Sequence, residues 1–290
     1  MQFGIVFPQT EMSPNPADIR AFTQAVDDMG FDYILAYDHV LGANPERPGG
    51  WDGPYTHETP FHEIFTLFAY MAALTERLSF VTGILILPQR QTALVAKQAA
   101  EIDLMTNGRF RLGVGVGWNQ VEMAGLGEDF GSRGKRIEEQ IEVLRLLWSQ
   151  ELVTYDGRYN TLHDVGIRPM PVQQPIPIWM GGGADVVLRR IARLADGWLP
   201  NSYPLEQTAT QVATLRRYLD DAGRDPSELG IDARVSAARH THAEWLKHLA
   251  AWRGWGATHL SLDTMRAGYT SVQQHLDAAQ DFITRMRDAS

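Results

Sequence analysis

The stretch FRLGVGVGWN at residues 110–119 reads as a β-strand that ends in glycines, followed by Trp118 and Asn119. Valines that alternate with Gly113 and Gly115 suit a crowded parallel strand whose end lets another group approach the backbone. The dinucleotide fingerprint G-x-G-x-x-G would need its third glycine at the position of Trp118. The stretch therefore predicts a strand that ends at a site outside the Rossmann class. The alternative is that its glycines only accommodate bulky neighbours inside a barrel.

Strand and helix patterns alternate along the rest of the chain. Apolar runs closed by Pro, Gly or Asn predict strands, and apolar residues at spacings of three and four predict helices. Besides the opening stretch, the predicted strands cover residues 3–7, 31–36, 78–87, 176–180, 197–200, 231–235 and 258–262. The predicted helices cover residues 16–29, 60–74, 92–105, 136–148, 187–194, 212–219 and 271–286.

About eight alternations in 290 residues fit a single (β/α)8 TIM barrel better than a doubly wound sheet. We expect one domain over residues 1–290, with a lid loop at about 40–59 and a hairpin insertion at about 150–175, where Asp156 and Gly157 signal a turn. Loops after the strands of such a barrel share one rim, where active sites lie. The residues expected to converge there are Asp38, His39, Gly83, Trp118, Asn119, Gly181, Gly182 and Gly183.

Composition narrows the classes of protein and partner. The chain is 44% hydrophobic and 21% charged, with a net charge of −9 and no block of Lys and Arg. This pattern argues against a nucleic acid or an anionic membrane as partner. The absence of cysteine excludes disulfides and a thiolate nucleophile and suits a reducing cytoplasm, which is the expected location. No basic segment precedes the first apolar run, and no apolar run reaches about 18 residues, so we expect neither export nor membrane insertion.

Three consecutive glycines follow the predicted fifth strand and precede a helix. The unhindered amides of Gly181, Gly182 and Gly183, together with the positive end of the helix dipole, can hold an anion such as a phosphate group. A Walker-type loop is absent, because no glycine here is followed by Lys and Ser or Thr at the required spacing. The pattern favours a phosphate site, with a plain tight turn as the alternative.

His39 is the one histidine that falls at a predicted strand end beside a carboxylate, that of Asp38. A histidine side chain can accept or donate a proton. A metal site made of His39, His57 and His62 is a weaker hypothesis, because their spacing matches no familiar ligand pattern. Five further histidines are interpreted as surface-loop residues, namely His163, His240, His242, His248 and His275.

The loop after the second strand holds Trp51 and Tyr55 among glycines and prolines. Such a long loop on a catalytic rim is typical of a lid or substrate wall, and disorder is the alternative. Gly83 within the third strand indicates a bulge or a close approach to the backbone, as a flat cofactor ring would make. Trp118 can stack on a ring or cap the barrel, and Asn119 can bond a ligand or cap the following helix.

Several long motifs resemble those of the bacterial luciferase-like family, and within it the branch of coenzyme F420-dependent oxidoreductases. They are GFDYILAYDHV, TGILILPQRQTALVAKQAAEIDLMTNGRFRLGVGVGWNQVEMAGLG, RGKRIEEQIEVLRLLW, PIPIWMGGG and ARLADGWLPN, in this order over nearly the whole chain. The resemblance implies a TIM barrel that binds the deazaflavin F420, or FMN in sister branches, with the ring in the barrel mouth. It also implies a homodimer.

The same resemblance implies roles for single residues. Asp38 and His39 match a pair after strand two, with the histidine near the reactive carbon of the ring. Gly83 and Ile84 match a bulge, often a non-prolyl cis peptide, that supports one ring face, and the triple glycine matches the phosphate cradle. The expected cofactor-binding residues are therefore His39, Gly83, Ile84, Trp118, Asn119, Gly181, Gly182 and Gly183.

The expected reaction is hydride transfer between C5 of F420 and a small organic substrate, with His39 as proton donor or acceptor and Asp38 orienting or tuning it. The family's sugar-phosphate dehydrogenases have a glutamate and a tryptophan where this chain has Trp118 and Ala43, which argues against a glucose-6-phosphate activity. One alternative is a monooxygenase that uses reduced FMN and O2 with a separate flavin reductase. Another is a non-catalytic flavin-binding barrel.

Overall fold

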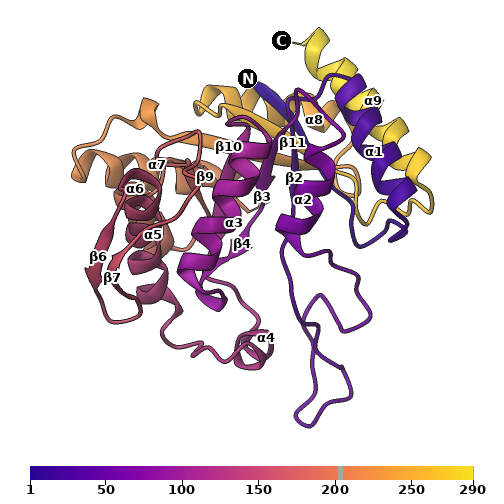
Figure 1. Ribbon diagram of the computed structural model, residues 1–290. Helices are drawn as coiled ribbons and strands as arrows, with labels where there is room; N and C mark the ends of the chain where they lie inside the picture. The colour runs from indigo at the N-terminus through magenta and orange to yellow at the C-terminus, as the bar shows by residue number, and fades with distance from the viewer. Residues whose placement is uncertain (202–204, 290) are drawn as a thin grey trace.

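The computed structural model describes residues 1–201 and 205–289, and these form a closed barrel of eight parallel strands with helices outside it (Figure 1). In chain order the barrel strands are β1 (Gln2–Val6), β2 (Tyr33–Ala36), β3 (Ser79–Thr82), β5 (Phe110–Gly115), β8 (Ile178–Gly181), β9 (Gly197–Leu199), β10 (Gly230–Ser236) and β11 (His259–Asp263). Each strand pairs with the next in this order, and β1 pairs with β11 to close the barrel. The predicted TIM barrel is confirmed.

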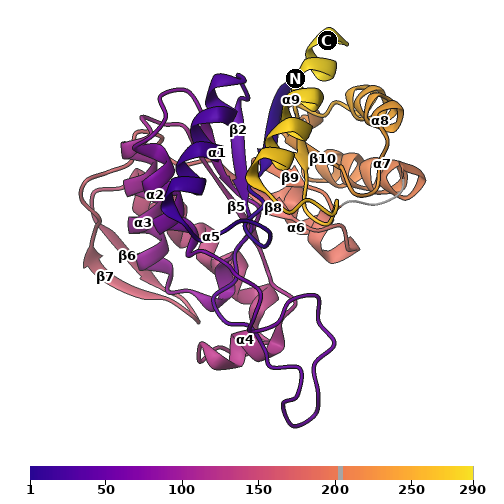
Figure 2. The same cartoon turned by 90° about the vertical axis from the view of Figure 1, so that its right-hand side faces the viewer.

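The helices that cover the barrel follow the strands in sequence. They are α1 (Pro16–Asp28), α2 (Ile64–Ala72), α3 (Thr92–Met105), α5 (Arg133–Ser149), α6 (Asp185–Leu194), α7 (Leu205–Asp221), α8 (His242–Gly254) and α9 (Val272–Asp288), with the short α4 (Gln120–Gly125) between β5 and α5. In Figure 2, α2 and α3 lie on one side of the strands and α7 and α8 on the other. The helix α8 was not predicted, because Leu246 and three alanines spread apolar residues around it and obscure its buried stripe.

The predicted third strand and the helix predicted from residue 60 differ from the structure in ways that shape the site. The third strand is split: β3 ends at Thr82, and β4 (Leu85–Ile86) pairs with β5 after a cis peptide between Gly83 and Ile84. The short 3-10 helix η1 (Leu87–Gln89) follows, and a second one, η2 (Pro226–Glu228), precedes β10. The helix expected from residue 60 begins only at α2, because Glu63 caps it by accepting a hydrogen bond from the Thr66 amide (2.8 Å).

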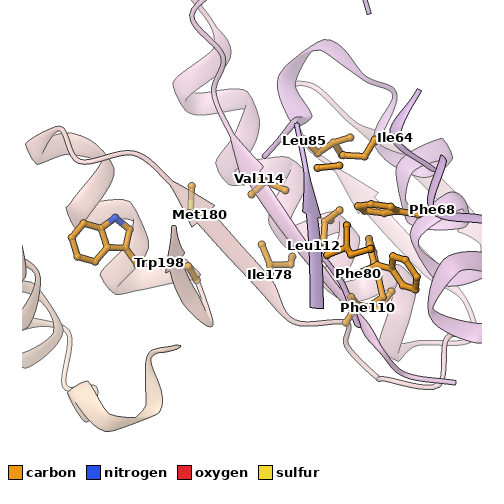
Figure 3. Close-up of a cluster of buried hydrophobic side chains, with 14 of the residues drawn as sticks. Ile64, Phe68, Phe80, Leu85, Phe110, Leu112, Val114, Ile178, Met180 and Trp198 are labelled. Atoms are coloured by element: carbon orange, nitrogen blue, oxygen red, sulfur yellow. The ribbon is translucent and has the colours of Figure 1, made fainter. Parts of the chain in front are cut away.

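Apolar side chains fill the space between strands and helices (Figure 3). Phe68 of α2 contacts Phe80 of β3 and Phe110 of β5, with ring centroids 5.3 and 6.4 Å apart. The interior of the barrel is partly polar. Tyr33 donates a hydrogen bond to Asp232 (2.6 Å), and the guanidinium of Arg111 lies over the Tyr33 ring. These side chains belong to the first half of their strands. They block the barrel there and leave open the rim at the strands' C-terminal ends.

The chain between β2 and α2 has neither helix nor strand and projects beyond this rim, at the same end as α4 (Figures 1 and 2). Trp51 Nε1 donates to the carbonyl of Tyr55 (2.7 Å), and the His57 amide donates to the carbonyl of Ala43 (3.0 Å), so the segment is tied to itself. We call residues 40–59 the lid segment.

Between α5 and β8, the strands β6 (Val153–Asp156) and β7 (Thr161–Val165) form an antiparallel hairpin outside the barrel. The turn that joins them includes Gly157, whose amide donates to the carbonyl of Asn160 (2.9 Å). Across the described residues, no helix combines the length and the apolar character that a membrane crossing requires.

Candidate active site

A cavity of about 420 Å³ opens at the C-terminal rim of the barrel, within the size range of small-molecule sites. It gathers side chains and backbone from the ends of β2, β4, β5, β8, β9 and β10. Of the residues expected to converge at the rim or to bind the cofactor, those that line the cavity are Asp38, His39, Gly83, Ile84, Trp118, Gly181 and Gly182. Asn119 and Gly183 lie outside its lining.

The His39 ring is held by a carboxylate that the sequence pattern did not single out. His39 Nδ1 lies 2.8 Å from Oε2 of Glu122, whose side chain is fully buried. The other oxygen, Oε1, accepts hydrogen bonds from the amides of Val40 (2.5 Å) and Leu41 (3.2 Å). Burial acts to raise the pKa of Glu122, but the hydrogen bonds from His39 and these amides outweigh it and hold the pKa below its usual value. Asn119 Oδ1 caps α4 by accepting from the Glu122 amide (3.0 Å), which is the helix-cap alternative for Asn119.

This pairing fixes which nitrogen of His39 can react. A carboxylate only accepts hydrogen bonds, so Nδ1 carries a hydrogen and Nε2 is the ring nitrogen left to exchange a proton with a ligand. Three rings surround the imidazole, those of Phe61, Tyr55 and Trp118, with centroids at 4.9, 5.2 and 5.5 Å. Trp51 stacks on Trp118 at 5.8 Å. Phe61, which the pattern assigned to a helix, thus belongs to an aromatic wall beside His39.

Asp38 has partners other than His39. Its Oδ2 accepts from the Ile86 amide (3.0 Å), and its Oδ1 accepts from Arg90 (2.7 Å). The expectation that Asp38 orients His39 therefore differs from the observed contacts, in which Glu122 holds the ring. Asp38 and His39 both follow the end of β2, and although they are neighbours in sequence, their side chains have different partners. Asp38 ties the end of β2 to β4 and to the chain that precedes α3.

Glycines at the rim make room for two isoleucines. A Cβ at Gly115 would lie 2.7 Å from Ile84 Cδ1, and one at Gly181 would lie 2.7 Å from Ile84 Cγ2. At Gly117, which has a φ of 75°, a Cβ would lie 2.6 Å from Ile86 Cγ2. These glycines therefore do accommodate bulky neighbours, and they also line the cavity. Their two interpretations are compatible.

The third-strand glycine and the triple glycine differ in their surroundings. A Cβ at Gly83 would overlap the side chain of Leu35, so the close approach expected there comes from a barrel side chain. Gly182 has a φ of 119°, and its amide donates to the carbonyl of Leu199 (3.2 Å). Gly183 packs against Gln211, which explains its place outside the cavity.

Several histidines lie away from this site. Neither His57 nor His62 is among the cavity-lining residues, and within residues 1–201 and 205–289 no group of three or more His, Cys, Asp or Glu is arranged to hold a metal ion. Two histidines interpreted as surface-loop residues are instead buried on helices, His248 of α8 and His275 of α9. His275 Nδ1 is bonded to Thr264 Oγ1 (2.8 Å), so its role is structural.

The cavity also contains a cation that the sequence pattern did not identify as functional. Arg234 of β10 lines it and donates to Tyr37 Oη (2.9 Å), which in turn donates to Asp263 Oδ2 (2.9 Å). The available signal was a charged residue inside the predicted strand at residues 231–235. A charge within a strand of a closed barrel has to point into the barrel or its mouth.

A family model described as luciferase-like monooxygenase matches residues 1–289. An uncharacterised protein of Mycobacterium tuberculosis is 38% identical over 188 residues, covering 64% of this chain and 64% of that protein. The F420-dependent glucose-6-phosphate dehydrogenase of Segniliparus rotundus is 32% identical over 230 residues, covering 76% of this chain and 64% of that protein. The FMNH2-dependent dimethylsulfone monooxygenase of Pseudomonas putida is 32% identical over 232 residues, covering 78% and 59%. The chain thus spans less than two thirds of the length of these relatives.

Among solved structures, an F420-dependent secondary alcohol dehydrogenase in complex with an F420-acetone adduct has a TM-score of 0.81 to this chain. The two are 17% identical, and the superposition covers 99% of each chain. At this identity the similarity establishes a shared fold.

Proposed function

The chain belongs to the luciferase-like monooxygenase family, and from this premise we propose that it is an oxidoreductase that transfers a hydride between coenzyme F420 and a small organic substrate. The observation that carries the proposal is the pairing of His39 with the buried carboxylate of Glu122 at the barrel mouth. It presents a proton donor or acceptor to the same cavity that the Gly83–Ile84 peptide lines. Hydride transfer to a carbonyl carbon, or from the carbon of an alcohol, needs such a partner for the proton on oxygen.

The cavity has the features that a flat heteroaromatic ring requires. Glycines leave the backbone open at the ends of β5 and β8, and Trp118, which is 44% exposed, offers a ring face. Arg234 lines the cavity, and the N–H groups of a guanidinium suit an oxygen acceptor of a pyrimidine ring. In our proposal Gly83, Ile84 and Trp118 contact the ring, and the backbone of residues 181–183 holds a phosphate group.

When bound, F420 supplies hydride chemistry at C5 of its ring. Oxidation of an alcohol removes a hydride from carbon and a proton from oxygen, and His39 Nε2 takes that proton; in the reverse direction it returns the proton to the carbonyl oxygen. Glu122 balances the positive charge that His39 then carries. The rings of Tyr55, Phe61 and Trp118 shield the imidazole from water, which strengthens this electrostatic pairing.

One observation favours a second candidate. The relative named as an FMNH2-dependent monooxygenase matches this chain at the same 32% identity as the F420-dependent relative. In that case the cavity would serve reduced FMN, O2 and a small-molecule substrate, and a separate flavin reductase would be a partner. For either candidate, we propose that the protein is a homodimer and is located in the cytoplasm.

The test is anaerobic turnover of reduced F420 with small ketones and aldehydes, and of oxidised F420 with the corresponding alcohols, followed by coenzyme absorbance. Replacing His39 with Ala should lower the rate by about 100-fold or more, which is the usual contribution of general acid–base catalysis. His163→Ala, on the exposed strand β7, is the matched control and should react at the wild-type rate. Oxygen uptake with reduced FMN and no reaction with F420 would favour the second candidate, and no reaction with either would favour a non-catalytic barrel.

A further inference from the structure

Arg234 occupies the interior of the barrel because of its register in β10. Side chains alternate along a strand, and Ala233 and Val235 belong to the cluster between strands and helices. Asp232 and Arg234 therefore point inward. Asp232 lies in the blocked half of the barrel, bonded to Tyr33, whereas Arg234 lies nearer the rim and lines the cavity.

The guanidinium of Arg234 has no carboxylate at ion-pair distance within the described chain. One of its nitrogens donates to Tyr37 Oη (2.9 Å), and its Nε is buried without a partner. The carboxylate beyond that tyrosine is Asp263, whose oxygens accept from Tyr37 Oη (2.9 Å) and from the Met265 amide (2.9 Å). Burial acts to lower the pKa of Arg234, but Tyr37, Asp263 and Asp232 outweigh it and hold the pKa above its usual value. The two carboxylates therefore stabilise the guanidinium from a distance, and neither of them binds it directly.

Two other arginines of the barrel each have a carboxylate at ion-pair distance, which Arg234 does not have in the described chain. The side chains of Arg90 and Arg111 are largely enclosed, with exposures of 14% and 12%. Each faces a buried carboxylate, Asp38 at 2.7 Å and Asp232 at 3.6 Å respectively. Arg234 differs from both because it lines the cavity and has no carboxylate at ion-pair distance among residues 1–201 and 205–289.

We propose that Arg234 binds an anionic oxygen of the ligand, so that the counter-ion of this cation arrives with the ligand. A planar guanidinium offers paired donors that match a carboxylate, and the nearby rings of Tyr55 and Trp118 suit an apolar or aromatic body. The substrate class is then a small organic acid. An oxygen of the pyrimidine ring of the coenzyme accepts the same hydrogen bonds without being a carboxylate, and it is the competing source of the contact. This inference rests on the proposed function for the coenzyme, but the anion site itself requires no turnover.

The first arm of the test uses benzoate and benzamide, which share a ring and a shape and differ in charge. Each is titrated into the coenzyme-free protein, and quenching of tryptophan fluorescence is followed, because Trp118 lines the cavity. Wild type should bind benzoate at least about tenfold more tightly than benzamide, a difference of about 1.4 kcal/mol. Arg234→Met should remove this preference, and Arg234→Lys should keep part of it. Arg266→Met is the control, since Arg266 is an exposed cation whose guanidinium carbon is 6.0 Å from the centroid of the Tyr55 ring, and it should keep the preference.

The second arm titrates F420 into the same variants, with thermal melting as a check on folding. Loss of the benzoate preference with unchanged F420 affinity assigns the anion to the substrate, and weaker F420 binding by about tenfold assigns it to the coenzyme. The inference is wrong if wild type does not prefer benzoate and F420 affinity is the same in wild type, Arg234→Met and Arg234→Lys. If Arg234→Met fails to fold, the wild-type preference and Arg234→Lys decide. Failure of the proposed function shows instead as absent F420 turnover, which the benzoate titration does not involve.

Discussion

His39 and Glu122 lie 83 residues apart in sequence, and their side chains meet at 2.8 Å across the barrel mouth. The same carboxylate accepts hydrogen bonds from the amides of Val40 and Leu41, where the lid segment begins. One buried side chain therefore orients the proposed proton carrier and anchors the start of the lid. Glu122 lies on the short helix α4, and the side chain of Asn119 caps the N-terminus of this helix.

Replacing Glu122 with Gln should lower kcat by about 100-fold while coenzyme affinity stays within about threefold. The neutral amide of glutamine cannot balance the charge of a positive imidazole. Its single oxygen can accept a hydrogen bond from His39 or from the lid amides, and its NH2 group, a donor, then faces the remaining donor. Steady-state kinetics and a fluorescence titration measure the two quantities. Glu142→Gln, on the exposed side of α5, is the control. Unchanged turnover in Glu122→Gln would remove this residue from the mechanism.

Replacing Asp38 with Asn should act mainly on stability, because Asp38 shares a buried ion pair with Arg90 (2.7 Å). Breaking one side of such a pair costs about 3 kcal/mol or more, so the urea midpoint should fall clearly. Glu151→Gln breaks the exposed pair with Arg168 and should leave the midpoint almost unchanged. Equal midpoints for Asp38→Asn and wild type would contradict the structural role assigned to this aspartate.

Gly115→Ala should destabilise the fold by about 1 to 3 kcal/mol, because its Cβ would press on Ile84 at 2.7 Å. Ile84→Ala combined with Gly115→Ala should recover part of this loss, since the second change removes the obstructing atoms. Denaturant titrations of the two single variants and the double variant measure the coupling. Gly254→Ala, where no atom lies within 4 Å of the added Cβ, is the control. Additive effects of the two changes would refute the contact.

The melting temperature should fall as the pH is lowered from 6.5 toward 3, in part because of His259. Burial, with the charge of Arg111 added, lowers the pKa of His259 to about 3. Between that value and about 6.5 the unfolded chain binds the proton and the folded chain does not, so stability rises with pH and is lost on acidification. His259→Gln should therefore lose less melting temperature between pH 7 and pH 4.5 than wild type or His163→Gln does. An equal loss in all three proteins would contradict this assignment.

The repeated alternation of strand and helix was sufficient to predict the barrel and to bring the ends of strands two to five to one rim. The pattern did not reveal which carboxylate holds His39. Sequence adjacency suggested Asp38, yet Asp38 binds Arg90, and the partner of His39 comes from α4. A contact between residues so distant in sequence leaves no local periodicity.

Glycine-rich stretches showed the same limitation. The spacing of Gly115, Gly117 and Gly181 correctly placed close contacts at the rim, but the bulky neighbours, Ile84 and Ile86, come from another strand. Arg234 was overlooked for a related reason. A single charged residue within a predicted strand does not reveal whether it faces the barrel interior or the helices until the closed barrel is known. Local sequence patterns predict the helices and strands, whereas contacts between distant parts of the chain determine which side chains meet at the ends of the strands.

The most direct test of the central proposal is a fluorescence titration of the purified protein with F420 and with FMN, each in oxidised and reduced form. Hydride transfer by a deazaflavin enzyme predicts that F420 binds at least about tenfold more tightly than FMN in both redox states. Tighter binding of reduced FMN than of F420, or binding of neither, would contradict it.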